Sequence, residues 1–300
     1  MRRLFISFSG GETSARMAHL LLTRWRKRWD EVVCGIANTA EENEETLVFA
    51  DQCDRHFGMR LVWVEADVQH GVRSATKHRI VTFQTASRKG EPFEEVVKKY
   101  GLPGPGRFHC TRELKLNPMK SYLASIGWEE GTYDTAIGIR ADESGRRRAD
   151  HVAERIIYPL LDWLPQTKPQ VNEFWMKQPF RLRLTGYQGN CKWCWKKSTR
   201  KHMTLLSEDP SKYDFPERMD RLYGTVGAEF EEGKNEYPYR TMFRGNLTTR
   251  QLRDAYEANK DSLAKAEDDA IVLPHNHELF PLDNEEGDCM EACEILGKAA

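Results

Sequence analysis

Short apolar runs alternate with amphipathic stretches over the first 67 residues of the chain. The runs at residues 4–8, 32–37 and 61–64 are of strand length. Between them, residues 15–22 and 42–57 carry apolar positions at helical spacing. Strands that alternate with helices in this way predict an α/β fold with a doubly wound, mostly parallel sheet and right-handed crossovers.

The hydrophobic pattern loosens over residues 69–107, which end in the glycine- and proline-rich sequence GLPGPGR. We expect this stretch to be an excursion over the substrate side of the domain. Regularity returns with a helix after Pro118, a buried strand at 136–139 and a further apolar segment at 156–161. Further along, residues 171–176 have a helical pattern.

The last part of the chain carries a helix-start signal and an acidic tail. Thr248 and Gln251 form a capping box that predicts a helix running to about Ala266. Residues 278–294 contain seven carboxylates and no Lys or Arg.

Composition narrows the class of protein. The chain has 300 residues, 45 Lys and Arg against 46 Asp and Glu, and 39% hydrophobic residues, which is ordinary for a globular protein. A chain of this length lies near the limit for one hydrophobic core. We therefore expect an α/β domain over residues 1–165 and a mainly helical C-terminal region over residues 166–300.

Several function classes are made improbable by what the sequence lacks. No apolar stretch approaches the ~20 residues that span a bilayer, and glycines follow the first apolar run too soon for a signal-peptide core. We expect a cytoplasmic protein without a membrane partner. Seven cysteines are too few for a disulfide scaffold, and clustered cysteines in such a chain indicate metal or redox chemistry. The net charge of −1 means that a nucleic acid would be bound only locally.

The glycine-containing sequence SFSGGETS lies between the first predicted strand and the helix that follows. The first N–H groups of a helix are unpaired and carry positive partial charge, so such a loop can hold a phosphate chain. It has neither the GxxxxGK[ST] nor the GxGxxG spacing, and the alternative is a plain strand-to-helix turn. The candidate phosphate-binding residues are Ser7, Ser9, Gly10, Gly11, Thr13 and Ser14.

Four segments in order resemble one protein family. They are SGGETS from Ser9, NTAEENEETL from Asn38, CTRELKLNPM from Cys110 and GIRADESGRR from Gly138. The chain resembles the phosphoadenosine-phosphosulfate (PAPS) reductase family of the PP-loop N-type ATP pyrophosphatase superfamily, over roughly residues 3 to 200. The last two segments also resemble the PP-loop component of DNA phosphorothioation systems. The resemblance implies a Rossmann-like fold of the PP-loop type that binds ATP or a PAPS-like adenine nucleotide, with Mg²⁺ as a further cofactor.

The segments also have a physical interpretation as a nucleotide site. Ligands of open parallel sheets bind beyond the carboxyl ends of the strands, where all of these loops are expected to meet. Asn38 and Thr39 offer polar groups for a base or ribose, and the resemblance implies adenosine. Arginine forks match phosphate or sulfate oxygens, although the cluster could also be a solvated loop. The further candidate residues are Gly138, Arg140, Glu143, Ser144 and Arg147, with Arg146 and Arg148 beside them.

Three features of the sequence, compared with the family pattern, favour different functions. The intact SGG core favours ATP cleavage, so adenylation of an acceptor with pyrophosphate release and then sulfur transfer is expected. The alternative is a sulfonucleotide reductase with Cys289 or Cys293 as nucleophile and a thioredoxin-like reductant, but the tail GDCMEACEIL lacks the family's ECGxH sequence. Thr13 stands where the family usually has Asp, which favours a non-catalytic nucleotide-binding accessory protein of a mobile element or defence system.

The cysteines are the candidate metal ligands. Cys191 and Cys194 have CxxC spacing, and Cys110 precedes the TRELK sequence. The resemblance implies that these three hold a [4Fe-4S] cluster with one open iron for a sulfide or substrate sulfur. Cys110, Cys289 and Cys293 are also the candidate catalytic thiols. The last two could instead supply a fourth ligand, form a redox pair, or bind zinc with His275 and His277.

The remaining cysteines and the basic residues near the CxxC sequence complete the predictions. Cys34 is expected to be an inert core residue, and Cys53 is given no role. Trp193 and Trp195 are followed by the basic segment 196–202, from Lys196 to His202. This surface could bind nucleic acid by stacking and phosphate contacts, or it could shield the cluster.

Overall fold

The computed structural model describes residues 1–72, 76–189, 191–227 and 238–271. The predictions made for the tail, including those for Cys289, Cys293, His275 and His277, lie outside the described residues. Within the described chain no helix has the length and hydropathy needed to cross a bilayer.

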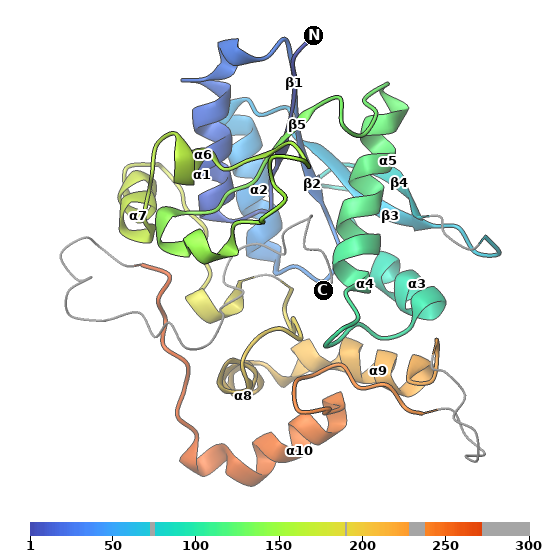
Figure 1. Ribbon diagram of the computed structural model, residues 1–300. Helices are drawn as coiled ribbons and strands as arrows, with labels where there is room; N and C mark the ends of the chain where they lie inside the picture. Colours follow the sequence, from blue (N-terminus) through green and yellow to red (C-terminus); the bar gives the residue numbers. More distant parts are fainter. Residues whose placement is uncertain (73–75, 190, 228–237, 272–300) are drawn as a thin grey trace.

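A six-stranded sheet forms the centre of the molecule, with the order β4-β3-β2-β1-β5-β6 (Figure 1). Every neighbouring pair is parallel except β3 and β4, which are antiparallel. The strands are β1 (Arg3–Ser7), β2 (Glu31–Ala37), β3 (Val62–Val68), β4 (Thr76–Val81), β5 (Asp134–Ala136) and β6 (Ile156–Ile157).

Helices cover both faces of this sheet, as the hydrophobic pattern predicted. Alternate side chains of β1 show why: Leu4 and Ile6 enter one core, whereas Phe5 enters another on the opposite face. The first core is shared with α1, α2 and α7, and the second with α5 (Figure 1). Their bounds are α1 (Glu12–Leu22), α2 (Glu44–Phe57), α5 (Asn117–Ser125) and α7 (Lys168–Met176). The α/β class is therefore confirmed, and α7 packs with the α/β layers although it follows residue 165.

Some elements differ from the sequence prediction. The stretch predicted as a loose excursion contains the edge strand β4 and α3 (Glu91–Tyr100). The apolar segment at 156–161 divides into β6 and α6 (Pro159–Asp162), because Pro159 starts a helical turn. The helix predicted from the capping box at Thr248 is α10 (Thr249–Asn259). It is shorter than predicted and is followed by the turn η6 (Lys260–Ser262).

A continuous helical segment leads from the CTRELK sequence into α5. It begins with α4 (His109–Thr111), passes through the π-helical turn η2 (Arg112–Leu116) and ends at Ser125. Single π-turns inside helices are often found at functional sites. Cys110 lies in the first turn of this segment, before the π-turn.

A third hydrophobic core lies beyond the carboxyl ends of the strands. It is formed by α3, α8 (Thr199–Glu208), α9 (Asp214–Tyr223) and α10, together with the tryptophans of the CxxC segment. Figure 1 shows these helices below the sheet, at the end opposite to the start of β1. The functional elements are therefore enclosed between two cores.

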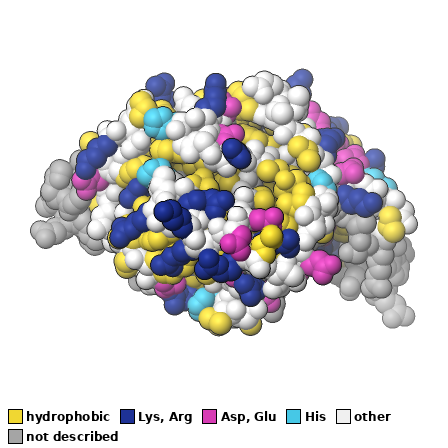
Figure 2. All heavy atoms as spheres, turned by 90° about the horizontal axis from the view of Figure 1, so that it is seen from above, with side chains coloured by type: hydrophobic (Ala, Val, Ile, Leu, Met, Phe, Trp, Pro, Cys, Tyr) yellow, Lys and Arg dark blue, Asp and Glu magenta, His cyan; other side chains and the backbone are white. Residues whose placement is uncertain are grey.

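The opposite, amino-terminal edge of the sheet is seen in Figure 2, where basic side chains gather over part of the surface. The turn η1 (Arg26–Arg28), which follows α1, lies at this edge. A surface hollow here is lined by Asp134, His151, Arg155 and Trp163 among others. No residue of the SGG loop borders it, so this hollow is separate from the predicted nucleotide site.

His202 of α8 is a buried titratable group that packs in the third core. Its side chain is 2% exposed and its Nδ1 lies 2.7 Å from the hydroxyl oxygen of Tyr213. Burial, with a smaller contribution from nearby Lys197, lowers the pKa of His202 to about 3. The folded protein therefore holds this imidazole neutral, whereas the unfolded chain protonates it near pH 6.5.

We predict that stability falls as the pH is lowered from 6.5 towards 3, because the unfolded chain then binds a proton that folded His202 excludes. The slope from this one group reaches at most about 1.4 kcal/mol per pH unit. Urea unfolding at pH 7.5, 6 and 5 measures it, and His202→Gln should reduce the slope. His70→Gln, at a half-exposed position paired with Glu95, is the control and should keep the wild-type slope. An equal slope in wild type and His202→Gln would contradict the prediction.

Candidate functional site

The topology places a candidate ligand site at the carboxyl ends of β1 and β5. The chain passes from β1 to β2 on one side and from β5 to β6 on the other, so the sheet has its switch point between β1 and β5. Loops at such a point separate and leave room for a ligand beyond the carboxyl ends. The SGG loop follows β1, and Gly138 and Arg140 follow β5. The sequence therefore correctly predicted that these segments meet.

Gly138 marks the contact between the two loops. A Cβ at this position would lie 3.0 Å from Ser14 Cα and 3.2 Å from Ser14 N. The missing side chain thus allows the end of β5 to approach the first turn of α1. The structure assigns Gly138 a packing function, in addition to the ligand contact that the sequence suggested.

The two glycines of the SGG loop have different reasons to be glycine. Gly10 has φ +82°, and a Cβ there would lie 2.6 Å from Thr46 Cγ2, so it is required by its own backbone and by the packing of α2. Gly11 has φ −101° and ψ 162°, which any residue can adopt, and it is the N-cap of α1. Ser14 Oγ donates to Gly11 O at 2.9 Å and accepts from Ser9 N at 3.2 Å. Only Gly11 can be substituted without changing the backbone.

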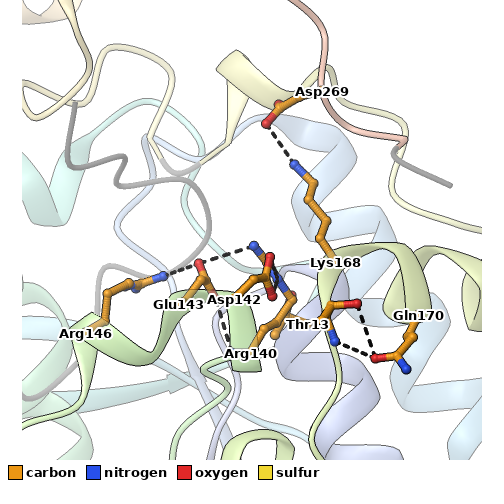
Figure 3. A network of polar contacts seen from close by, with 9 residues as sticks. Thr13, Arg140, Asp142, Glu143, Arg146, Lys168, Gln170 and Asp269 are labelled. Atoms are coloured by element: carbon orange, nitrogen blue, oxygen red, sulfur yellow. Dashed lines mark hydrogen bonds and ion pairs between the residues drawn. The ribbon is translucent and has the colours of Figure 1, made fainter. Parts of the chain in front are cut away.

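Arg140 extends from the loop after β5 to the start of α1. Its side chain is 6% exposed, and its NH1 donates to Thr13 Oγ1 at 3.1 Å. Nε lies 3.2 Å from Asp142 and NH2 lies 3.4 Å from Glu143 (Figure 3). The neutral side chain of Thr13 therefore contacts a buried guanidinium at the place where the sequence predicts a phosphate.

The other residues of the arginine loop occupy different positions. Arg146 forms an ion pair with Glu143 at 2.6 Å, so it stays in the Arg140 network. Arg147 pairs instead with Asp162, and Ser144 is exposed on the turn η3 (Ala141–Arg146). The structure thus brings Arg140 and Glu143 to the SGG loop and directs Arg147 elsewhere. Ser7 ends β1 and is buried beside this loop.

Two buried ion pairs at this edge were missed by the sequence analysis. Glu12 of α1 accepts from Arg181 Nε at 3.1 Å and from NH2 at 3.0 Å. Lys168 at the start of α7 lies 2.9 Å from Asp269. The start of α7 had a readable signal, because Thr167 and Gln170 form a capping box. The pairs themselves join residues too far apart in sequence to be recognised.

Asn38 and Thr39 follow β2, and their side chains are engaged within the protein. Asn38 is fully buried, and its Nδ2 donates to Glu65 at 2.7 Å and to Ser87 O at 2.8 Å. Thr39 Oγ1 donates to Glu42 at 2.8 Å. Asn38 thus fixes the loop after β2, and its amide is not directed to an open surface where a nucleobase could reach it.

The three cysteines expected to share a metal centre line one small pocket. Cys110 comes from the helix before the π-turn, and Cys191 and Cys194 come from the CxxC segment. Thr39, Lys115 and three aromatic rings complete the lining. The grouping of these cysteines across about 80 positions agrees with the sequence prediction.

Glu41 attaches the CxxC segment to the loop after β2. Its carbonyl oxygen accepts from Lys192 N at 2.8 Å, and its carboxylate accepts from Trp193 Nε1. Nearby, Thr39 Oγ1 lies 3.6 Å from Cys191 Sγ. Burial raises the pKa of Glu41 to about 7. The loop after β2, which carries Thr39 and Glu41, is therefore directly joined to the cysteine pocket.

The chemistry of this pocket fits an iron–sulfur cluster. Cysteine thiolates are the usual ligands of such clusters, usually four of them, and this pocket offers three. Trp195 also lines the pocket, and its Nε1 is buried without a hydrogen-bond partner among the described residues. An N–H group in this situation suits a sulfur acceptor. As they stand, no three His, Cys, Asp or Glu side chains of the described chain are arranged closely enough to hold a metal ion.

The two tryptophans beside the cysteines are internal, whereas the basic segment 196–202 is internal only in part, with Arg200 exposed. Trp193 is 1% and Trp195 6% exposed, so their rings pack under the pocket and are not available for stacking on a base. Lys197 and His202 are also buried. The burial of both rings agrees with the shielding of the pocket, and nucleic-acid binding through the exposed basic side chains stays a prediction.

Comparison with known proteins adds a phage and an archaeal relative. No family model matches the chain. It is 30% identical over 297 residues to the "Uncharacterized nin region protein ORF290" of Escherichia phage lambda, which covers 97% of this chain and 94% of the relative. It is 28% identical over 158 residues to the "Uncharacterized protein MJ0066" of Methanocaldococcus jannaschii, which covers 52% of this chain and 26% of the relative.

We predict that Glu65 is essential for the position of the loop after β2. The fully buried carboxylate accepts from Asn38 Nδ2, Ser87 N and Arg79 NH2. In Glu65→Gln one amide N–H must face a donor, so the free energy of unfolding should fall by about 1–3 kcal/mol. Chemical denaturation measures the change.

Glu31→Gln is the matched control, because its carboxylate pairs with Arg3 at a 42% exposed position. This change should alter the free energy of unfolding by less than about 1 kcal/mol. Equal effects of the two substitutions would show that Glu65 is not special.

Proposed function

This chain belongs to the family of the nin region protein ORF290 of Escherichia phage lambda, and we propose that it is a PP-loop enzyme that binds ATP. In this proposal an acceptor oxygen attacks the α-phosphorus of ATP, the bond to the bridging oxygen breaks, and pyrophosphate leaves with Mg²⁺. A sulfur nucleophile then replaces the activated oxygen, and AMP is released.

One observation carries the proposal: the SGG loop, Arg140 and the three cysteines lie at the same edge of the sheet. Thr39 lies in the loop after β2, the strand next to β1 in the sheet, and its Oγ1 lies 3.6 Å from Cys191 Sγ. An activated substrate held over the SGG loop would therefore be near the thiols. A phosphate site and a sulfur site so joined are what sulfur transfer to a nucleotide-activated acceptor requires.

The charges of the site support an anionic ligand. The start of α1 carries positive partial charge from the helix dipole, and Gly11, its N-cap, adds no side chain there. Arg140 adds a buried guanidinium that contacts Thr13. A phosphate oxygen can take the place of a carboxylate on such a fork because both accept two parallel hydrogen bonds.

The cysteines and Trp195 would hold an iron–sulfur cluster with one open iron, which supplies a binding position for sulfur when the cluster is present. Thiol ligands of this kind suit a reducing compartment, so the proposal places the enzyme in the cytoplasm. Lys115, which lines the same pocket, adds positive charge near the sulfur site.

We predict that Gly11→Ala weakens nucleotide binding while the protein stays folded. Its backbone suits alanine, so stability should change by no more than about 1 kcal/mol, whereas the new Cβ would obstruct the phosphate-binding N–H groups. Calorimetric titration with α,β-methylene ATP measures the affinity, which should fall at least about tenfold, or 1.4 kcal/mol.

Gly10→Ala provides the contrast. It should lower the melting temperature, because its Cβ meets Thr46 and its φ is positive. A folded Gly11→Ala protein with wild-type affinity would remove the phosphate-loop assignment.

We also predict that Cys110→Ser, Cys191→Ser and Cys194→Ser each lower iron and acid-labile sulfide in anaerobically purified protein. The common pocket of these thiols is the reason. Cys34→Ser is the control, because Cys34 is buried in β2 and burial raises the pKa of its thiol. Full zinc occupancy without iron would refute the cluster.

The reaction class is tested by its products. Pyrophosphate release that depends on an acceptor supports the proposed enzyme. Release of sulfite from PAPS with thioredoxin would instead establish the reductase. Binding of α,β-methylene ATP without turnover of ATP on any nucleic-acid or small-molecule acceptor would favour the accessory protein, for which Thr13 in place of aspartate is the supporting observation.

A further inference from the structure

The chain returns to the phosphate-loop edge through residues 263–271, which we call the strap. Figure 1 shows the strap leading from the end of α10 back towards α7. Ala266 N donates to Thr204 Oγ1 at 2.8 Å, and Gly186 N donates to Asp268 at 2.9 Å. None of the nine strap residues is buried. Leu263 and Ala266 pack against the core of α8 and α10, whereas the later strap residues, from Glu267 on, lie at the surface with exposed or half-buried side chains. This later part of the strap can therefore open at low cost.

The strongest contact of the strap is made with a buried cation. The Lys168 side chain is 6% exposed, and its Nζ lies 2.9 Å from Asp269 Oδ2, as Figure 3 shows. Lys168 is the first residue of α7, where the helix dipole is positive, so its ammonium group requires a nearby anion. That anion is Asp269 of the strap, whose side chain is 31% exposed.

Lys168 belongs to the same edge as the candidate phosphate site. Ala141 N, next to Arg140, donates to Gln166 O at 2.9 Å, two residues before Lys168. At the other end of α7, Trp175 Nε1 donates to Glu12 O at 3.0 Å in the first turn of α1. The segment that carries Lys168 is thus attached at both ends to the elements that would hold the nucleotide.

We infer that Asp269 is an internal anion that occupies Lys168 in the free protein, and that the polyphosphate of the nucleotide takes its place when the strap lifts. The exchange replaces one carboxylate by a phosphate of higher charge with more acceptor oxygens. Lys168 is then a phosphate-binding residue, and the strap is an autoinhibitory contact that a bound nucleotide releases.

This inference rests on the proposed function, because it assumes that the ligand of the site is a polyphosphate. It explains why a surface segment carries carboxylates to a buried lysine over 101 positions of sequence. The wild-type protein must release Asp269 before the anion binds, so its apparent affinity is reduced by the closed fraction.

The test compares wild type, Asp269→Asn, Asp269→Glu and Lys168→Met by calorimetric titration with α,β-methylene ATP and with inorganic tripolyphosphate. Asp269→Asn should bind both ligands about fivefold more tightly, because the competing charge is removed. Asp269→Glu keeps the charge and should bind much as wild type does. Lys168→Met should bind both ligands at least about fivefold more weakly.

The control variant is Glu267→Gln, since Glu267 is an 86% exposed strap carboxylate that lies 4.0 Å from Arg200 and does not contact Lys168. Its affinity should equal that of wild type. A second readout is tryptic cleavage after exposed Lys265 in the full chain, which tripolyphosphate should accelerate. Melting temperatures confirm that each variant is folded.

The outcomes separate this inference from the proposed function. If α,β-methylene ATP binds wild type and Asp269→Asn equally and cleavage does not change, the strap is only structural and the nucleotide proposal stands. Another outcome is that tripolyphosphate gives the expected differences among the variants while α,β-methylene ATP binds wild type no more tightly than tripolyphosphate does. In that case the anion exchange stands and the nucleotide proposal fails. If neither ligand binds any variant, both are overturned.

Discussion

The buried carboxylate of Glu12 holds the phosphate loop and the second half of the chain together. It lies in the first turn of α1, where negative charge is favoured by the helix dipole, and it is 5% exposed. Arg181 binds it through two nitrogens, and Leu182 N donates to it at 3.3 Å. Loss of one partner would leave an uncompensated buried charge, which costs about 3–5 kcal/mol. The segment that leads to the CxxC sequence is therefore kept beside the SGG loop.

The same constraint organises the rest of the edge. Lys168 and Glu65 are buried charges that pair with Asp269 and Arg79, respectively. Buried Arg140 pairs within its own loop, with Asp142 and Glu143, and donates a hydrogen bond to Thr13 at the start of α1. Buried ion pairs add little to stability compared with well-packed apolar residues, but they fix which segments meet. Here the ion pairs of Glu65 and Lys168 hold β3 and α7 against their neighbours, and the hydrogen bond from Arg140 to Thr13 joins the loop after β5 to α1. The site is thus specified by charge pairing on a scaffold that is stabilised by hydrophobic cores.

The sequence was most informative where the signal was local. The strands and helices of the first 64 residues follow from periodicity, and the convergence of the SGG loop with Gly138 follows from the topology. The strand β4 was missed because its sequence, TKHRIV, is polar and lies at an exposed edge. The contacts of Lys168 and Glu12 were missed because their partners, Asp269 and Arg181, are distant in sequence and no periodicity links them. The roles of Asn38 and Trp195 depended on burial, which a motif does not contain.

The π-turn between Cys110 and α5 has a consequence for how this protein family can vary. A π-turn holds one residue more than the α-helical turn it replaces, and each residue of an α-helix advances by about 100°. The face of α5 that packs Met119 and Leu123 against the sheet is therefore rotated relative to Cys110 by an amount that a regular helix would not give. The thiol can point into the cysteine pocket while α5 keeps its own apolar face inward. The direction of the Cys110 thiol and the packing of α5 can therefore change independently of each other. A one-residue deletion within Arg112–Leu116 would turn either the thiol away from the pocket or the apolar face of α5 away from the sheet.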